Sequence, residues 1–395
     1  MYNNSMHVVL VSDTYHPYIS GVSSSTHSIA RFLADQGHRV TVITPQQARR
    51  DPSVDHEPGI RVVRTWSVWD PWYKGRKVTP VPFLIPEIYP VLTKDVDIVH
   101  VQEPTFLGLT VRNIARHRDI PVVGALHFTP EQIARMVLWI PLNWSISLTK
   151  AYIRWVYNRY DEIMVPTQTF VDFLHSIGVT KQTIVISNGV DVKRFQPVKD
   201  TQPFRKKLGL PADRVLFFVL GRFDRDKYVD DVVKALPDAT QNIELVIAGV
   251  GPEQESLHAL GDKLGVSKRI HWVGQIRDDE MVDYYHASDG YVIMSLHEVQ
   301  SITTLQAVAS GLPVVAVRAG ALPELAVDGV NGYLVEPHDS KTLGARLSQL
   351  AGDRALCARM GAESRIISLK HDKTKAMARV ESWHASVVEK YGKRR

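Results

Sequence analysis

Cysteine is almost absent from this chain, since Cys357 is the only one among 395 residues. A single thiol excludes an internal disulfide and any zinc site built from cysteines. The neighbours Leu356 and Ala358 are typical of an ordinary helix, so we interpret Cys357 as a packing residue rather than a nucleophile. Such sparing use of cysteine fits a reducing compartment.

Long apolar runs are absent as well. No run of about 18 apolar residues occurs, so the sequence predicts no membrane-spanning helix. Residues 1–6 lack the charged and then apolar layout of a secretory signal. We therefore expect a cytoplasmic protein.

Several motifs with known chemistry are missing or incomplete. Gly249 and Gly251 lack the rest of the dinucleotide-binding fingerprint, which argues against NAD. No Gly-x-Ser-x-Gly elbow occurs, and no His, Asp and Glu cluster has metal-ligand spacing, so we expect no metal. The net charge of +5 is modest, and no basic platform with interleaved aromatics accompanies it, so nucleic acid is not an expected partner.

The sequence does contain two series of short, β-branched apolar runs, which we interpret as buried strands separated by helices. In the first series the strands are expected at 7–12, 40–43, 61–64, 98–101, 122–126, 162–166 and 183–187. In the second they are expected at 215–220, 243–248, 270–273, 290–294, 314–317 and 332–335. Alternating strands and helices predict parallel sheets, and a chain of 395 residues is long enough for two domains.

A turn-rich stretch over residues 188–191 separates the two series. We expect one domain over 1–190, a second over 191–372, and a C-terminal segment over 373–395 that is largely a basic helix and returns to the first domain. The predicted fold class is α/β, with two Rossmann-like domains facing a central cleft.

Residues 295–306 combine a strand end, a short polar loop and a helix that opens on Ser301. Unpaired backbone N–H groups and the helix dipole make such a place an anion site, and Glu298 at its mouth can accept hydrogen bonds from hydroxyls. The combination suits a ligand with phosphate and sugar.

A second loop, 221–227, follows the first strand of the second series and carries Arg222 and Lys227. Two cations beside a helix N-terminus suit a diphosphate. Alternatively, the loop is solvated and pairs its own basic residues, Arg225 and Lys227, with Asp224 and Asp226.

Two residues of the first half follow predicted strands. Gly21 would let the backbone approach a phosphate or sugar closely, although a simple turn also explains it. His127 ends a strand and is a candidate for chemistry, although a structural histidine is the alternative.

These pieces, in this order, resemble a GT-B nucleotide-sugar glycosyltransferase of the family-4 retaining type. The motifs are the Asp13-Thr-Tyr-His-Pro start, the linker at 188–191, the loop from Gly221, the Ala287-Ser-Asp289 segment, and 295–306 with the following Gly311-Leu-Pro. The resemblance implies metal-independent transfer of a hexose from a UDP- or GDP-sugar with retained configuration, the first domain taking the acceptor and the second the donor.

The resemblance also implies individual roles. Glu298 and His127 would be the catalytic residues at the donor sugar, and Gln275 and Ile276 would flank the base. The donor diphosphate would be held by Arg222, Lys227, Gly21 and the backbone N–H groups of Ser301, Ile302 and Thr303.

Gln306 departs from the family pattern, which has a second Glu that binds the ribose hydroxyls. Gln keeps an acceptor oxygen but loses the charge that strengthens such bonds. Gln306 therefore either still contacts the ribose through its amide or marks low activity or an altered donor.

Two aromatic and basic segments of the first half bear on the acceptor. Residues 130–160 contain Trp139, Arg135, Lys150 and Arg154, and residues 66–77 contain Trp69 and Trp72. Apolar residues among cations predict a helix that docks peripherally on an anionic membrane, the alternative being a buried helix with a basic solvent face.

We therefore expect a glycosyltransferase acting on a membrane lipid or glycolipid at the inner face of the cell membrane. The alternatives are a soluble enzyme that builds a polysaccharide or small glycoside, and a nucleotide-sugar-binding protein with weakened turnover. A nucleotide-sugar epimerase is more distant, because it requires more acid and base groups than His127 and Glu298 supply.

Overall fold

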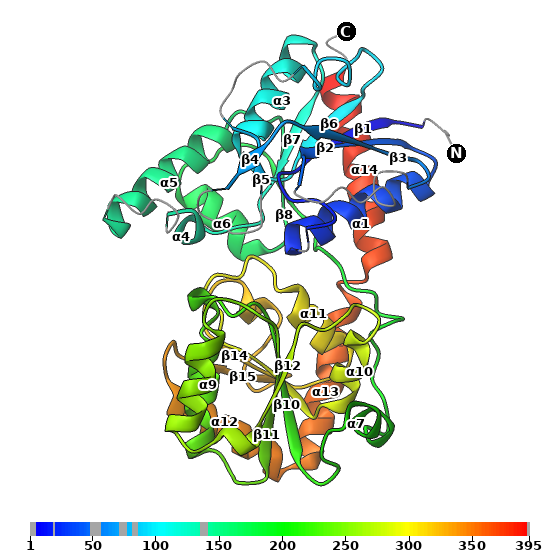
Figure 1. The fold of residues 1–395 in the computed structure, drawn as a ribbon. Helices are drawn as coiled ribbons and strands as arrows, with labels where there is room; N and C mark the ends of the chain where they lie inside the picture. The colour runs from blue at the N-terminus through cyan, green and yellow to red at the C-terminus, as the bar shows by residue number, and fades with distance from the viewer. Residues whose placement is uncertain are drawn as a thin grey trace. The chain divides into compact units, whose positions relative to one another are not determined.

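The computed structural model describes residues 5–18, 20–47, 57–70, 77–80, 86–134 and 141–392. The chain divides into two compact units (Figure 1). Unit 1 comprises Met1–Asn188 with Thr374–Arg395, and unit 2 comprises Gly189–Lys373. Each unit contains one large parallel sheet, which confirms the predicted α/β class.

The sheet of unit 1 has seven parallel strands in the order β3-β2-β1-β6-β7-β8-β9. The central strands are buried on both faces, as expected for β-branched runs in a sheet covered by helices. The strands are β1 (His7–Val11), β2 (Arg39–Pro45), β3 (Ile60–Thr65), β6 (Ile98–Val101), β7 (Val122–Ala125), β8 (Ile163–Val165) and β9 (Thr183–Val185).

Helices cover both faces of this sheet (Figure 1). One face packs against α1 (Gly21–Asp35) and the C-terminal α14 (Lys373–Tyr391). The other carries α3 (Phe106–His117), α5 (Leu142–Tyr157) and α6 (Gln168–Ser176), with the short α4 (Pro130–Ala134) before α5. A small antiparallel pair, β4 (Val68–Trp69) with β5 (Lys77–Val78), was not predicted from the sequence.

Polar contacts with the buried side chains of Glu162 and His100 hold α14 to unit 1. Trp383 Nε1 donates to Glu162 Oε2 at 2.9 Å, and Lys390 Nζ pairs with Glu162 Oε1 at 2.9 Å. His384 Nε2 lies 3.1 Å from His100 Nδ1, and both rings are fully buried. The last helix is therefore part of the core of unit 1.

The sheet of unit 2 has six parallel strands in the order β12-β11-β10-β13-β14-β15. They are β10 (Val215–Leu220), β11 (Ile243–Ala248), β12 (Ile270–Gly274), β13 (Gly290–Ile293), β14 (Val314–Val317) and β15 (Gly332–Val335). On one face lie α8 (Val229–Ala235), α9 (Gln254–Lys263) and α12 (Ser340–Gly352). On the other lie α7 (Gln202–Leu208), α10 (Met281–Ala287), α11 (Ile302–Ala309) and α13 (Arg354–Leu369). Short 3₁₀ turns are η1 (Arg225–Lys227), η2 (Leu236–Asp238), η3 (Ser267–Arg269) and η4 (Leu322–Glu324).

Both sheets reverse their strand order once, between β1 and β6 in unit 1 and between β10 and β13 in unit 2. The chain leaves neighbouring strands in opposite directions at such a point, so a crevice opens beyond their carboxyl ends, where open α/β sheets bind ligands. The topology therefore predicts that ligands bind at the loops after these four strands.

None of the helices in the described part of the chain is both long and apolar enough to cross a membrane.

Candidate active site

The loops after β10 and β13 meet at the reversal point of unit 2. Lys227, in the 3₁₀ turn η1, places its Nζ atom 2.7 Å from Glu298 Oε1 and 3.4 Å from Ser295 Oγ. Glu298 and Ser295 belong to the loop between β13 and α11. The structure thus brings together the two loops that the sequence indicates, through oppositely charged side chains.

Lys227 remains a cation in this setting. Burial by itself would lower its pKa, but the carboxylates of Glu298, Asp226 and Asp224 outweigh burial and raise the pKa above the ordinary value. A fixed positive charge therefore lies at the carboxyl edge of the sheet, where an anionic ligand would gain from it.

Arg222 lies in the same loop with its side chain about half exposed, and its guanidinium pairs with Asp224 Oδ2 at 2.6 Å. The internal pairing expected of a merely solvated loop is wrong, because Arg225 pairs with Glu253 at 3.1 Å and Lys227 pairs with Glu298. Arg225 and Lys227 therefore anchor the loop to other segments of unit 2, while Arg222 pairs within the loop.

Helix α11 begins at Ile302, with Ser301 as its N-cap. Ser301 Oγ accepts a hydrogen bond from Thr304 N at 3.1 Å, as Ser commonly does at this position. The N–H groups of the first turn have no partner within the helix, so Ile302 and Thr303 present donors of the kind that bind phosphate oxygens. The predicted diphosphate residues of unit 2 therefore lie around one reversal point.

Two buried tyrosines, neither of them predicted from the sequence, support the start of α11. Tyr291, on β13, donates its hydroxyl proton to Thr303 Oγ1 at 2.7 Å. Tyr285, on α10, places its hydroxyl 2.9 Å from the Thr303 carbonyl oxygen and 3.0 Å from Gln306 Oε1. No local motif signals such contacts, because the partners come from separate elements.

Glycines that carry no motif allow the loops of unit 2 to pack closely. A Cβ atom on Gly249 would lie 1.8 Å from the carbonyl oxygen of Gly221, and one on Gly251 would lie 2.6 Å from that of Phe223. Gly320, after β14, would bring a Cβ atom to 2.7 Å from the carbonyl oxygen of Glu298. These glycines therefore allow the loops that carry Lys227 and Glu298 to pack closely. A side chain at any of the three positions would displace those loops.

Gln275 and Ile276 follow β12 at the same carboxyl edge, Gln275 exposed and Ile276 half-buried. β12 is the outer neighbour of β11, two strands from β10. These residues thus lie toward one end of the edge that holds Lys227.

The reversal point of unit 1 is also closed by a carboxylate. Glu103, after β6, accepts hydrogen bonds at Oε2 from the backbone N atoms of Asp13 and Thr14, at 2.8 and 3.1 Å. Ser12 Oγ donates to the same atom at 3.1 Å. Glu103 therefore fixes the loop after β1, which leads to Gly21.

His127 follows β7 at this edge and is half-buried. Its Nε2 atom lies 2.9 Å from Gln102 Oε1, and burial lowers its pKa to about 4. The ring is therefore neutral near pH 7 and can act as a hydrogen-bonding group.

Gly21 is the exposed first residue of α1, next to the N-cap Ser20.

The predicted membrane residues are only partly described. Lys150 and Arg154 lie on α5, half-buried and exposed respectively, and Trp69 on β4 is 58% exposed, with Lys77 Nζ 5.0 Å from the centre of a Trp69 ring. Three further predicted residues, Arg135, Trp139 and Trp72, lie outside the described residues.

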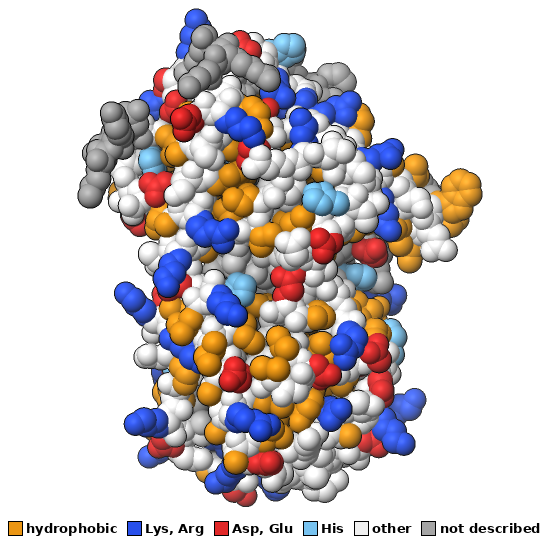
Figure 2. All heavy atoms as spheres, turned by 180° about the vertical axis from the view of Figure 1, so that it is seen from behind, with side chains coloured by type: hydrophobic (Ala, Val, Ile, Leu, Met, Phe, Trp, Pro, Cys, Tyr) orange, Lys and Arg blue, Asp and Glu red, His pale blue; other side chains and the backbone are white. Residues whose placement is uncertain are grey.

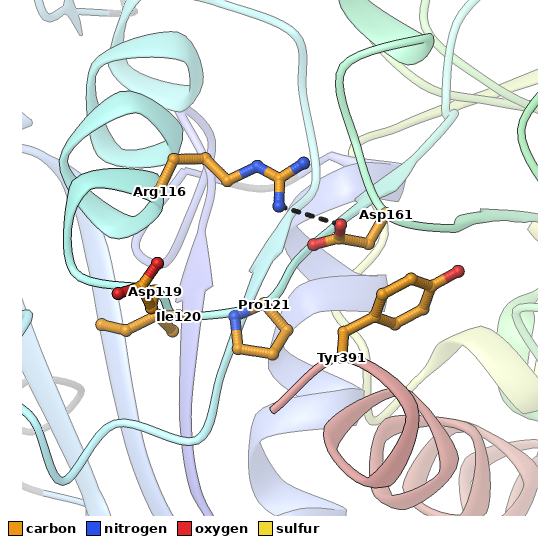
Figure 3. A pocket seen from close by; sticks show the side chains of 6 residues that line it. All are labelled: Arg116, Asp119, Ile120, Pro121, Asp161 and Tyr391. Atoms are coloured by element: carbon orange, nitrogen blue, oxygen red, sulfur yellow. Dashed lines mark ion pairs between the residues drawn. The ribbon is translucent and has the colours of Figure 1, made fainter. Parts of the chain in front are cut away.

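A pocket in unit 1 lies at the amino-terminal edge of the sheet (Figure 3). It is therefore separate from the loops after β1, β6 and β7, which lie at the carboxyl edge. Its walls are Arg116, Asp119, Ile120, Pro121, Asp161 and Tyr391. Asp161 pairs with Arg116 at 3.0 Å and accepts from Val122 N at 2.8 Å, so both carboxylate oxygens hold the fold together. We assign this pocket no chemistry.

Among the described residues, no group of three His, Cys, Asp or Glu side chains could hold a metal ion. The positive charge at the candidate site comes from Lys227 and Arg222.

The two parallel sheets and their connections match solved GT-B glycosyltransferase structures. One is HepE from Anabaena in complex with UDP and glucose, with a TM-score of 0.77, 20% identity, and coverage of 96% of this chain and 100% of that chain. The fold class is therefore GT-B.

Residues 19–194 match the family described as Glycosyltransferase Family 4, and residues 200–366 match the family described as Glycosyl transferases group 1. The chain belongs to these glycosyltransferases, which confirms the resemblance seen in the sequence.

Relatives of this chain include a monoglucosyldiacylglycerol synthase and a mannosyltransferase. Alpha-monoglucosyldiacylglycerol synthase from Streptococcus pneumoniae is 28% identical over 83% of this chain and 75% of its own length. GDP-mannose-dependent alpha-mannosyltransferase from Corynebacterium glutamicum is 26% identical over 88% of this chain and 81% of its own length.

Proposed function

We propose that this glycosyltransferase moves a hexose from a UDP- or GDP-sugar to a lipid or glycolipid, with retention and without a metal. The observation that carries the proposal is the contact between Lys227 and Glu298 at the reversal point of unit 2, beside the start of α11. This arrangement offers a cation and helix N–H groups to a diphosphate, and a carboxylate to sugar hydroxyls.

In the proposed transfer, the bond between the sugar C1 atom and the phosphate oxygen breaks, and its electrons remain on the diphosphate. Lys227, Arg222 and the N–H groups of Ile302 and Thr303 favour this step because they stabilise the growing negative charge. The acceptor hydroxyl oxygen then bonds to C1 on the face that the phosphate leaves, which retains the configuration, and the hydroxyl proton passes to the departing phosphate oxygen.

The remaining site residues have supporting roles in the proposal. Glu298 accepts hydrogen bonds from hydroxyls of the donor sugar, and Gln275 with Ile276 flanks the base. The roles of His127 and Gly21 are those that the family resemblance implies. Both UDP and GDP remain candidates, since HepE binds UDP and one relative is named for GDP-mannose.

An exposed apolar face of α5 supports a lipid acceptor. Trp144, Leu148 and Trp155 are 72%, 57% and 46% exposed, and together with the exposed Ala151 they recur at helical spacing on one side of α5. Figure 2 shows hydrophobic side chains gathered at a projection on its right, where α5 lies after the half-turn from Figure 1. Ile153, an apolar residue of the same helix, is instead buried in the core.

The basic residues beside the apolar face of α5 indicate which kind of membrane this face would contact. No acidic residue lies between Glu131 and Asp161, while Arg154 is exposed on α5 and the Arg159 guanidinium lies 4.0 Å from the centre of a Trp155 ring. Indole rings and leucine with flanking cations favour the interface of an anionic bilayer.

Helix α5 is also fastened to the carboxyl edge of the unit 1 sheet. Tyr157 Oη donates to the carbonyl oxygen of Ala125 at 2.7 Å, and Tyr152 Oη donates to that of Pro104. The apolar face is thereby held to the edge that carries His127 and Glu103, so a lipid head group could reach this edge while its chains stay in the bilayer.

Product formation tests the proposed transfer. The full chain is incubated with UDP-glucose or GDP-mannose and vesicles of phosphatidylglycerol and diacylglycerol, and lipids are analysed by mass spectrometry. We expect a hexosyl-lipid whose anomeric proton coupling matches that of the donor. Saturable nucleotide binding with neither transfer nor donor hydrolysis would instead favour the binding-protein alternative, which the substitution at Gln306 makes worth testing.

Flotation with anionic vesicles tests the membrane face. Replacing both Trp144 and Trp155 with Ser should abolish flotation and lower transfer to vesicles while leaving donor affinity unchanged. The matched control replaces Ile366 and Leu369 on α13, which are 53% and 47% exposed and lie far from these tryptophans in sequence. Equal flotation of the tryptophan variant and the wild type would refute the docking surface.

A further inference from the structure

Gln306 and Tyr285 meet within unit 2 in a contact that the proposed transfer does not yet use. Gln306 is half-buried on α11, and Tyr285 is fully buried on α10. The Tyr285 hydroxyl lies 3.0 Å from the Gln306 side-chain amide and 2.9 Å from the carbonyl oxygen of Thr303. One hydroxyl therefore faces two groups of the same helix.

Counting protons decides how the amide is turned. The Tyr285 hydroxyl has one proton, and the Thr303 carbonyl can only accept, so an amide oxygen facing Tyr285 would leave one of the two contacts of Tyr285 without a proton. Rotating the Gln306 side-chain amide by half a turn exchanges its oxygen and nitrogen. Nε2 then donates to Tyr285 Oη, while Oη donates to the carbonyl oxygen of Thr303. This arrangement makes two hydrogen bonds instead of one and is therefore favoured.

The packing around Tyr285 fixes its side chain, so its hydroxyl has little freedom to reach another hydrogen-bond partner. Its ring packs edge-on against Phe195 and Phe218, with centroids 5.6 and 5.0 Å apart, and lies 6.0 Å from the ring of Tyr291. Burial also raises its pKa well above the ordinary value, so the hydroxyl keeps its proton. The amide must adapt to the tyrosine rather than the reverse.

We infer that Tyr285 is a positioning residue that turns the Gln306 carbonyl oxygen outward as an uncharged acceptor for the ribose hydroxyls of the donor. The inference rests on the proposed function, which places the diphosphate at the start of α11. Gln306 lies four residues after Ile302, about 6 Å along the helix. A ribose attached to the diphosphate spans a similar distance.

The inference explains how Gln can stand where the family has Glu. A carboxylate presents an oxygen in either orientation, so it needs no neighbour to turn it, whereas an amide presents either a donor or an acceptor. The contact with Tyr285 fixes the orientation of the Gln306 amide. Its effect on ribose recognition should therefore depend on which residue occupies position 306.

A double-mutant cycle measures this dependence. Calorimetry gives the affinities of the full chain for UDP and GDP and for their 2′,3′-dideoxy forms, in the wild type, Tyr285→Phe, Gln306→Glu and the double variant. We expect Tyr285→Phe to reduce the preference for the ribose form about three- to tenfold, the value of one neutral hydrogen bond. In the Gln306→Glu background the same change should alter the preference less than about twofold.

Two further variants separate positioning from general damage. Tyr284→Phe removes a hydroxyl from the adjacent residue of α10 and should leave the preference unchanged. Gln306→Met fills a similar volume without an amide and should lose the preference whether or not the Tyr285 hydroxyl is present.

The outcomes distinguish failure of the inference from failure of the proposed function. If neither UDP nor GDP binds the wild type, both are overturned. Equal binding of ribose and dideoxy forms by the wild type overturns the inference alone, because Gln306 then does not contact the ribose. An equal effect of Tyr285→Phe in the Gln306 and Glu backgrounds also overturns it.

Discussion

Lys227 and Glu298 show what a sequence can say about single residues. Their types and positions after strands predict an anion site, and the structure joins them at 2.7 Å across two loops. Tyr285 and Gly249 were not predicted, because their importance lies in contacts with Gln306 and Gly221 that no local pattern encodes. The amide orientation of Gln306 likewise depends on a partner 21 residues earlier.

Replacing Lys227 with Met should lower kcat/KM for the donor by about 10²- to 10³-fold, because it removes a fixed charge aimed at the departing diphosphate. Steady-state kinetics with varied donor concentration measures the change. Lys234→Met is the matched control, since Lys234 pairs with Asp230 on an exposed helical turn and should leave the rate intact.

A loss below about tenfold for Lys227→Met would contradict its role at the diphosphate. The variant also leaves Glu298 without its cation, so thermal unfolding should accompany the kinetics. Lys227→Met combined with Glu298→Gln removes the unpaired charge and should restore stability without restoring the rate.

At the scale of elements, strands were easier to predict than surfaces. Runs such as 215–220 and 243–248 are buried on both faces of a parallel sheet, so their composition alone identifies them. The hairpin of β4 and β5 has two residues in each strand, too short for any periodic signal. On α5, tryptophan and isoleucine look equally apolar in the sequence, and only the packing separates the exposed Trp144 from the buried Ile153.

The C-terminal helix α14 gives unit 1 a defined pH dependence. Burial, with a contribution from His38, lowers the pKa of His384 to about 3, and burial also lowers that of His100 well below its usual value. Between about pH 6.5 and pH 3 the unfolded chain binds a proton at His384 that the folded chain does not. Stability should therefore fall as the pH falls through this window.

Urea unfolding at several pH values tests this sign. His384→Leu should make the dependence of the unfolding free energy shallower by about 1.4 kcal/mol per pH unit, the value for one proton. His175→Leu, which replaces an exposed histidine on α6, should leave the slope unchanged. An unchanged slope for His384→Leu would show that the buried ring does not titrate as described.

At the scale of the whole molecule, each unit closes the reversal point of its sheet with a glutamate. Glu103 holds the loop after β1 in unit 1, and Glu298 holds Lys227 in unit 2. The two strand–helix series could be predicted because alternation along the chain dictates parallel sheets, and the GT-B class could be predicted from the resemblance that the ordered motifs carry. The acceptor could not be predicted, because an acceptor surface depends on which side chains the fold leaves exposed.

The most direct measurement of the central claim is a calorimetric titration of the full chain with UDP and with GDP. We predict saturable binding of at least one nucleotide, weakened about ten- to a hundredfold in Lys227→Met because a charge-assisted hydrogen bond is lost. Absence of binding at millimolar nucleotide, or equal affinity in the wild type and Lys227→Met, would contradict the assignment of a donor diphosphate to Lys227 and the start of α11.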